Sequence, residues 1–231
     1  MRNERMSRRI ADADNPGAYD QRLARWLMRP FVNSRLAPNH VTTATLILCL
    51  VAAVLFATGH GPAIHVAAGL FVLARFLDHG DGELARMQGT ASRLGARYDY
   101  VAGALSYAAL FIGIGIGLSD SWLGAAALVL TVLGVLAGVA HMLLRVTARQ
   151  ARVGRGPDGG SDGMGQAAGD YPRFGRFDLE DGIYLLAPAT WLGGLSVFFV
   201  LAAAGAVVFA LWTAFQQVRE TMPRSHGPGA R

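Results

Sequence analysis

Residues 77–103 read LDHGDGELARMQGTASRLGARYDYVAG, and this stretch joins two long apolar segments of the chain. Asp78 and Asp81 are three residues apart, so on a helix their side chains lie on the same face. After a short break, Asp99 follows Gly95 by four residues at the start of the next apolar segment. The spacing predicts two helices that meet at their ends and bring three carboxylates to one point.

The apolar segments are long enough to cross a bilayer, which requires about 20 mostly apolar residues per helix. Of the 231 residues, 52% are hydrophobic and only 16% are charged, whereas soluble domains carry about a quarter charged residues. The sequence therefore predicts an all-α integral membrane protein with six transmembrane helices. We expect them at about 41–58, 62–77, 97–118, 122–145, 180–194 and 195–217, with a tight turn at Gly193-Gly194 between the last two.

The basic residues group on one side of these spans. All 21 are arginine, and the connections near 58–62, 118–122 and 193–194 contain none of them. By the positive-inside rule, both termini and the 77–103 stretch face the cytoplasm, which fits a bacterial inner membrane. The net charge of +5 is thus explained by topology, and no nucleic-acid partner is expected. The absence of lysine excludes a Schiff-base mechanism, and the single cysteine, Cys49, excludes a disulfide framework.

An amphipathic segment precedes the first span at residues 18–32. Its apolar residues recur at helical spacing beside arginines, which favours an interfacial helix on the inner leaflet. A simple charged leader is the alternative interpretation. The residues that form the pattern are Leu23, Trp26, Leu27 and Phe31, with Arg22, Arg25 and Arg29.

Gly113 and Gly117 lie four residues apart inside the third expected span. This spacing is typical of close helix–helix packing in membranes. A nucleotide-binding glycine motif is not expected in the middle of an apolar helix.

Three carboxylates held together repel one another, and a divalent cation relieves that repulsion. Ligands that are all oxygen favour Mg²⁺ or Mn²⁺ over zinc. Arg86 and the small residues Gly82, Ala85 and Gly95 lie beside the acidic residues, and this combination suits a diphosphate ligand. The alternative is that the carboxylates only pair with arginines at the membrane surface, namely Arg86, Arg93 and Arg97.

The spacing of these residues resembles the signature of the CDP-alcohol phosphotransferase family. The resemblance rests on Asp78-x2-Asp81-Gly82-x2-Ala85-Arg86-x8-Gly95-x3-Asp99, together with the Pro38–Thr42 sequence that precedes the first span. It divides the chain into an N-terminal tail (1–17), a membrane domain (18–218) and a C-terminal tail (219–231).

The resemblance implies a homodimeric enzyme that transfers a phospho-alcohol from a CDP-alcohol to a second alcohol and releases CMP. Asp78, Asp81 and Asp99 match its metal ligands, and Gly82, Ala85 and Gly95 match residues that line the cytidine diphosphate. Arg86 matches a diphosphate contact. We expect Asp99 and Arg86 to be catalytic, because metal and arginine neutralise charge on the diphosphate and on the leaving CMP.

The chain departs from the family motif at Gly103, where the family has a further aspartate. That carboxylate serves in the family as a metal ligand and as the general base, and such a base contributes about 10²–10⁴ in rate. Four explanations of this departure are open. Another residue of the chain acts as the base, the chain is feeble or inactive, the acceptor needs less help from a base, or the glycine is an engineered substitution. The candidate replacement bases are His79, Glu83, Asp178, Glu180 and Asp181.

Two groups of arginines are candidates for binding the acceptor. Arg145, Arg149 and Arg152 form a stripe at the inner end of the fourth span, and Arg93 and Arg97 flank Asp99. A stripe of this kind suits the phosphate of a phospho-alcohol or of a lipid acceptor. Anchoring at the cytoplasmic membrane surface explains the same stripe equally well.

Two other functions are consistent with the sequence. In the first, the chain keeps the fold and binds CDP-alcohol and metal in an impaired or regulatory role, because Gly103 lacks the base. A divalent-cation transporter is the remote alternative, and it would require the carboxylates to face one another in the middle of the membrane.

Overall fold

The computed structural model describes residues 26–32, 34, 36–153 and 179–221, and the regular elements in these ranges are all helical. Within these ranges, five helices are long and apolar enough to cross a membrane, which indicates an integral membrane protein. The elements in chain order are η1 (Arg29–Phe31), α3 (Pro38–Ala57), α4 (Gly61–Gln88), α5 (Arg93–Gly117), α6 (Ala125–Val153), η4 (Leu179–Leu185), α7 (Leu186–Trp191) and α8 (Leu195–Thr221).

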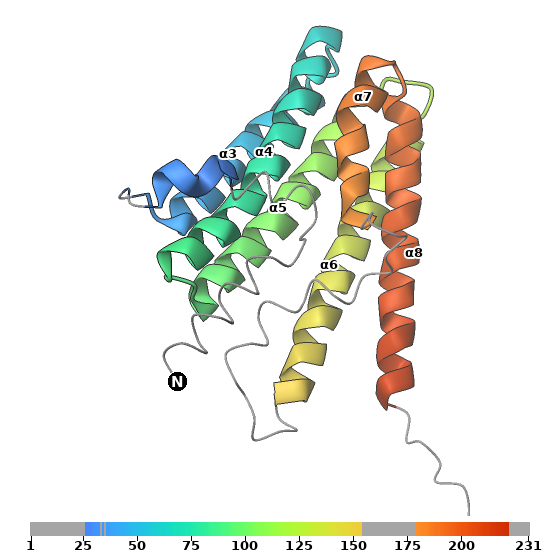
Figure 1. Cartoon of the computed structure of the whole chain (residues 1–231). Helices are drawn as coiled ribbons and strands as arrows, with labels where there is room; N and C mark the ends of the chain where they lie inside the picture. Colours follow the sequence, from blue (N-terminus) through green and yellow to red (C-terminus); the bar gives the residue numbers. More distant parts are fainter. Residues whose placement is uncertain (1–25, 33, 35, 154–178, 222–231) are drawn as a thin grey trace, which may run out of the picture.

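The helices form two neighbouring groups (Figure 1). In the first group α3 packs against both α4 and α5, and in the second α6 packs against α8. The groups meet where α5 contacts α6 and where α4 contacts α7. The ends of α6 and α8 extend beyond the first group (Figure 1). The shared core contains Phe56, Phe71 and Phe199 among many alanines, so the helices approach one another closely.

The fifth expected span, 180–194, is described over η4 and α7, which together cover Leu179–Trp191. These two elements rise about 23 Å, against a hydrocarbon core of about 30 Å, and the residues just before Leu179 lie outside the described part of the chain. Pro188 has no N–H to donate to the carbonyl of Tyr184, so the α-helix begins only two residues before it. The tight turn does occur where expected, with Gly193 at a φ of +78°.

Of the expected interfacial helix, 18–32, residues 18–25 lie outside the described part of the chain. Residues 26–28 are helical and lead into η1. Met28 is buried against Gly80 of α4, whereas Trp26 is 66% exposed. The Gln88 side chain donates hydrogen bonds to the carbonyls of Phe31 (3.4 Å) and Leu36 (3.0 Å), which holds this segment against the end of α4.

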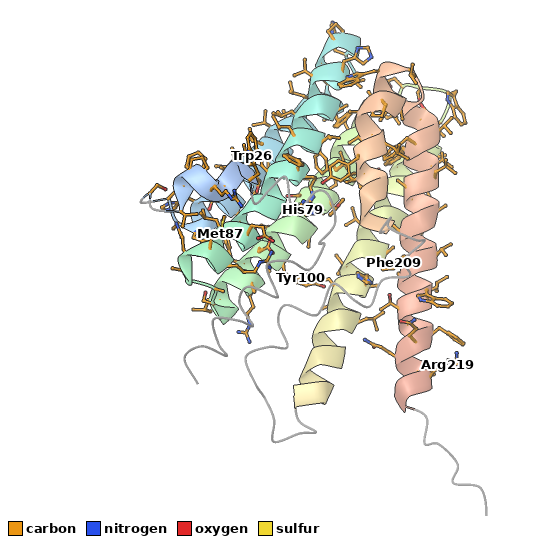
Figure 2. The ribbon with its side chains drawn as sticks, viewed as in Figure 1. Trp26, His79, Met87, Tyr100, Phe209 and Arg219 are labelled. Atoms are coloured by element: carbon orange, nitrogen blue, oxygen red, sulfur yellow. The ribbon has the colours of Figure 1, made fainter. Side chains whose placement is uncertain are left out.

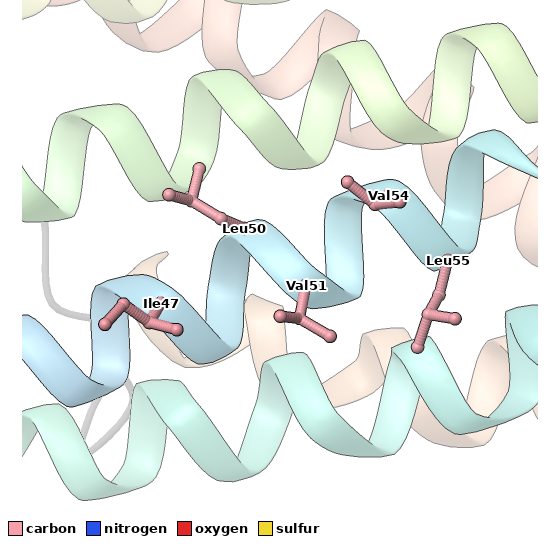
Figure 3. A pocket seen from close by; sticks show the side chains of 5 residues that line it. All are labelled: Ile47, Leu50, Val51, Val54 and Leu55. Atoms are coloured by element: carbon pink, nitrogen blue, oxygen red, sulfur yellow. The ribbon is translucent and has the colours of Figure 1, made fainter.

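The outer faces of the helices are apolar, as expected for contact with lipid. On α3, an open hollow is lined only by aliphatic side chains (Figure 3), from Ile47, Leu50, Val51, Val54 and Leu55. Large aliphatic side chains on these faces are more than half exposed, among them Ile47, Val54 and Leu201, as expected where helices contact lipid.

The predicted glycine packing is confirmed where α3 crosses α5. A Cβ at Gly113 would overlap the carbonyl of Ala53, and one at Gly117 would overlap the carbonyl of Phe56. The backbones of the two helices therefore touch at these positions, which only glycine permits. This contact fixes the position of α3 relative to α5, on which the site described below depends.

We predict that Gly113→Ala lowers the stability of the detergent-solubilised protein by about 1–3 kcal/mol, because the methyl group pushes α3 away from α5. Gly138→Ala is the matched control, since Gly138 lies in α6 with nothing within 4 Å of its Cβ position. Thermal unfolding of both variants measures the difference. Equal melting temperatures would contradict the proposed close contact.

Candidate metal and diphosphate site

The acidic residues lie on two successive helices that are joined by a short turn. Asp78 and Asp81 lie in the C-terminal half of α4, between Arg75 and Met87, and Asp99 lies in the second turn of α5. His79 and Met87, labelled in Figure 2, mark this part of α4. α4 ends at Gln88 and is followed by Gly89, which has the left-handed φ of +68° that suits glycine. The Ser92 side chain caps α5 by accepting a hydrogen bond from the Gly95 N–H (3.0 Å).

The predicted convergence of the carboxylates is confirmed. One oxygen each from Asp78, Asp81 and Asp99 lies within 4.8 Å of the other two. Oxygens bound to one Mg²⁺ ion at about 2.0–2.1 Å are about 2.9 Å apart at neighbouring positions and about 4.1 Å apart at opposite ones, so the three carboxylates would draw closer together to bind a single ion. The donor set is entirely oxygen, and the residues present therefore fit a hard divalent cation.

Two threonines of α3 hydrogen-bond to the acidic cluster. Thr42 donates to Oδ2 of Asp81 (2.5 Å), and Thr45 donates to Oδ1 of Asp78 (2.9 Å). Both threonines are buried, as is Asp81, which is 6% exposed. A buried carboxylate requires such donors, because it has lost its hydrogen bonds to water. Our sequence analysis assigned no role to these threonines, although their spacing of three residues at the start of an apolar helix was a usable signal.

Arg75 is a third residue to which the sequence analysis assigned no role in the site. Its Nη1 lies 2.6 Å from Oδ2 of Asp78, and its guanidinium carbon lies 5.0 Å from the centre of the Tyr107 ring. The side chains of Arg75 and Asp78 are each only 12% exposed. The i,i+3 spacing of the pair was the signal in the sequence. Arg75 is thus a cation inside the site, on α4 and facing α5.

Gly103 faces this arginine. A Cβ at position 103 would lie 4.0 Å from Nη1 of Arg75. The position at which the family motif has an aspartate is therefore next to a guanidinium, and a side chain has room there.

Arg86 does not pair with the aspartates in the described interactions. It donates to Oε1 of Glu83 at 2.6 Å, and its side chain is 57% exposed whereas that of Glu83 is 3% exposed. The expected competing arrangement, in which the aspartates pair with Arg86, Arg93 and Arg97, is therefore wrong for Asp78, which pairs with Arg75. Arg86 remains accessible to a ligand at the edge of the cluster.

The small residues keep the surface beside the cluster open. A Cβ at Gly82 would lie 3.7 Å from a terminal nitrogen of Arg86. A Cβ at Gly95 would lie 3.1 Å from the Ser92 hydroxyl and 3.4 Å from the Asn39 amide oxygen, so α5 passes close to the start of α3 here. Ala85 is partly exposed one residue before Arg86.

The structure describes the side chains of only some of the other predicted residues. Arg97 is exposed on α5, and Nδ1 of His79 lies 2.9 Å from the carbonyl of Arg75. Arg145, Arg149 and Arg152 lie in the last turns of α6, Arg93 begins α5, and Glu180 and Asp181 lie in η4, but their side chains are outside the described part of the structure. Asp178 also lies outside it.

Comparison with known proteins agrees with this arrangement. Residues 35–221 match the family described as CDP-alcohol phosphatidyltransferase. The chain belongs to this family. The match covers every span and all the acidic residues named above, and it makes the general reaction type a transferase reaction.

The same fold is found in solved structures of phosphatidylinositol phosphate synthase (PgsA1) from Mycobacterium tuberculosis. The structure with CDP-DAG bound is 19% identical and has a TM-score of 0.61, over 91% of this chain and 100% of the other. The structure with manganese and citrate is 20% identical with a TM-score of 0.63, over 90% and 93%. At these identities the likeness establishes the fold alone. Among curated proteins, no significant match to the sequence is found.

We predict that Thr42→Val lowers the free energy of unfolding by about 1–3 kcal/mol, because it removes a hydrogen bond from the buried Asp81 carboxylate. Mn²⁺ should restore part of the loss by neutralising that carboxylate. Thr43→Val is the control, since the Thr43 hydroxyl is exposed and lies 2.8 Å from that of Tyr98. Thermal unfolding with and without Mn²⁺ measures both effects, and equal shifts in the two variants would contradict the prediction.

Proposed function

We propose that this protein is an integral-membrane transferase that moves a phospho-alcohol or phosphatidyl group from a CDP-alcohol to an acceptor alcohol and releases CMP. The observation that carries the proposal is the convergence of Asp78, Asp81 and Asp99 within 4.8 Å in a chain of this family. These three residues would hold Mg²⁺ or Mn²⁺. Bound there, the ion would neutralise the donor diphosphate and stabilise the charge on the departing CMP.

The chain's own residues would bind and orient the diphosphate beside that centre. Arg86, on the exposed side of the cluster, would turn from Glu83 toward a phosphate oxygen. Gly82, Ala85 and Gly95 would let the cytidine diphosphate approach the α4 and α5 backbones closely. Thr42 and Thr45 would keep the oxygens of Asp81 and Asp78 oriented.

The transfer balances as a displacement at phosphorus. The acceptor hydroxyl oxygen forms a bond to the phosphorus that carries the donor alcohol, and the bond from that phosphorus to the CMP oxygen breaks. CMP takes the electron pair, and the hydroxyl proton passes to a base. Asp99, on the face of α5 that meets the other carboxylates, would take that proton in the absence of a carboxylate at position 103.

The environment of the reaction is also part of the proposal. The arginine distribution supports an active site at the cytoplasmic surface of a bacterial inner membrane, with both termini on the same side. The donor or the acceptor would be a lipid, and Arg93, Arg97, Arg145 and Arg149 are the candidates for binding a phosphorylated acceptor. The family resemblance supports a homodimer.

We predict that the purified protein in lipid nanodiscs binds CDP-diacylglycerol in the presence of Mn²⁺. Asp99→Asn should weaken this binding by more than about 100-fold, because changes even to outer partners of metal ligands cost about 10–100-fold. Asp120→Asn makes the same chemical change on an exposed turn between α5 and α6 and should leave binding unaltered. Isothermal titration calorimetry measures the affinities. Binding that needs neither Mn²⁺ nor Asp99 would overturn the proposal.

The second candidate function is an impaired or regulatory family member that binds donor and metal without efficient turnover. The observation that favours it is the proximity of Arg75 to position 103, where the family has its base. Uptake of Mn²⁺ into liposomes that contain the protein tests the remaining alternative, cation transport.

Turnover by Gly103 variants distinguishes the first two functions. If the chain is impaired, we expect Gly103→Asp alone to gain little, because Arg75 would pair with the new carboxylate. Gly103→Asp combined with Arg75→Met should then gain about 10²-fold or more in CMP release, the contribution of a positioned base. A wild-type rate that neither variant raises would contradict impairment.

A further inference from the structure

The ion pair between Arg75 and Asp78 changes the charge of the acidic cluster. Three carboxylates carry three negative charges, and the guanidinium 2.6 Å from Oδ2 of Asp78 cancels one of them. A single divalent ion would find one carboxylate oxygen on each of Asp78, Asp81 and Asp99. A second divalent ion would have to bind beside both the first ion and the guanidinium. Repulsion between these cations is strong, because the pair is only 12% exposed and poorly screened by water.

The position of Arg75 is set by contacts on both helices. The Tyr107 ring lies under the guanidinium at 5.0 Å, and Tyr107 is one turn beyond Gly103 on α5. Gly103 itself has no side chain to occupy the space, and its Cβ position is 4.0 Å from Nη1. Arg75 thus lies against the α5 surface that an aspartate at position 103 would use.

The hydrogen bonds to Asp78 also indicate that Arg75 limits how this carboxylate can bind a cation. One oxygen of Asp78 accepts from Thr45 and the other from Arg75, so both are already engaged by the protein. Asp81 accepts a hydrogen bond from Thr42 at Oδ2. A bound ion would therefore share Asp78 with the guanidinium.

We propose that Arg75 is a built-in cation of this site, which occupies the space left by Gly103, neutralises Asp78 and limits the cluster to one divalent ion per chain. Arg75 is a positioning residue, since it acts through Asp78. The inference rests on the proposed function only in assuming that the cluster binds a divalent metal.

The test is the number and affinity of Mn²⁺ ions bound, measured by electron paramagnetic resonance titration of the purified protein in nanodiscs. We expect one Mn²⁺ per wild-type chain. Arg75→Met should bind its first Mn²⁺ at least about tenfold more tightly, because a repelling charge is removed. Arg75→Lys keeps the charge and should resemble the wild type. Arg219→Met, which removes an exposed arginine of α8, should also bind Mn²⁺ as the wild type does.

Gly103→Asp provides an independent arm. Alone, it should leave the count at one ion, because the new carboxylate pairs with Arg75. Combined with Arg75→Met, it should raise the count to two, which makes the effects of the two substitutions non-additive.

Several outcomes would overturn the inference. A wild-type chain that binds two Mn²⁺ ions, or no Mn²⁺ ion, would do so. Weaker Mn²⁺ binding by Arg75→Met would also overturn it, because that result is expected if the arginine only orients Asp78. So would an Arg75→Lys variant that behaves like Arg75→Met. If Arg75→Met does not fold, as judged by size-exclusion chromatography, Arg75→Gln replaces it, and the wild-type count still decides. CDP-diacylglycerol binding is measured on the same samples. A wild-type chain that binds one Mn²⁺ but no CDP-diacylglycerol would contradict the proposed function and support this inference. A wild-type chain that binds two Mn²⁺ and CDP-diacylglycerol would support the proposed function and contradict this inference.

Discussion

Mutual repulsion among Asp78, Asp81 and Asp99 is the constraint on which the rest of the structure depends. Their oxygens lie within 4.8 Å of one another where two apolar helices meet, and little water reaches them to screen the charge. Such a cluster persists only if each carboxylate receives compensating donors or a cation. Thr42, Thr45 and Arg75 supply them to the two aspartates of α4.

These donors explain why the site needs three helices rather than the two that carry the motif. α4 and α5 contribute the carboxylates, but α3 contributes the threonine hydroxyls, and its place is set at the far end by the glycine contacts with α5. At the near end, α3 is also close to α5, where the amide oxygen of Asn39 lies 3.4 Å from the Cβ position of Gly95. Packing deep in the membrane thus determines hydrogen-bond geometry at the acidic cluster.

The features that could be predicted from the sequence are those encoded in spacing along one helix. The helical period placed Asp78 and Asp81 together, and the four-residue spacing of Gly113 and Gly117 predicted the close contact. The short turn between α4 and α5 made the convergence of Asp99 with Asp78 and Asp81 predictable. Other interactions between helices were not readable, because periodicity does not say which residue of α3 faces which residue of α4. The threonine donors were missed for that reason. Hydropathy also did not register the change from 3₁₀-helix to α-helix just before Pro188 in the fifth expected span.

Fixing α3 to α5 at both ends also determines how the protein adapts to bilayers of different thickness. A helix that rotated by one residue would turn through about 100°, which would break the glycine contacts and remove the threonines from the carboxylates together. α3, α4 and α5 must therefore respond to hydrophobic mismatch by tilting as one body. The α6–α8 pair is joined to this body through α5, because the Thr131 hydroxyl of α6 donates a hydrogen bond to the carbonyl of Phe111 (3.3 Å). The geometry of the acidic cluster is thereby insulated from changes in lipid chain length.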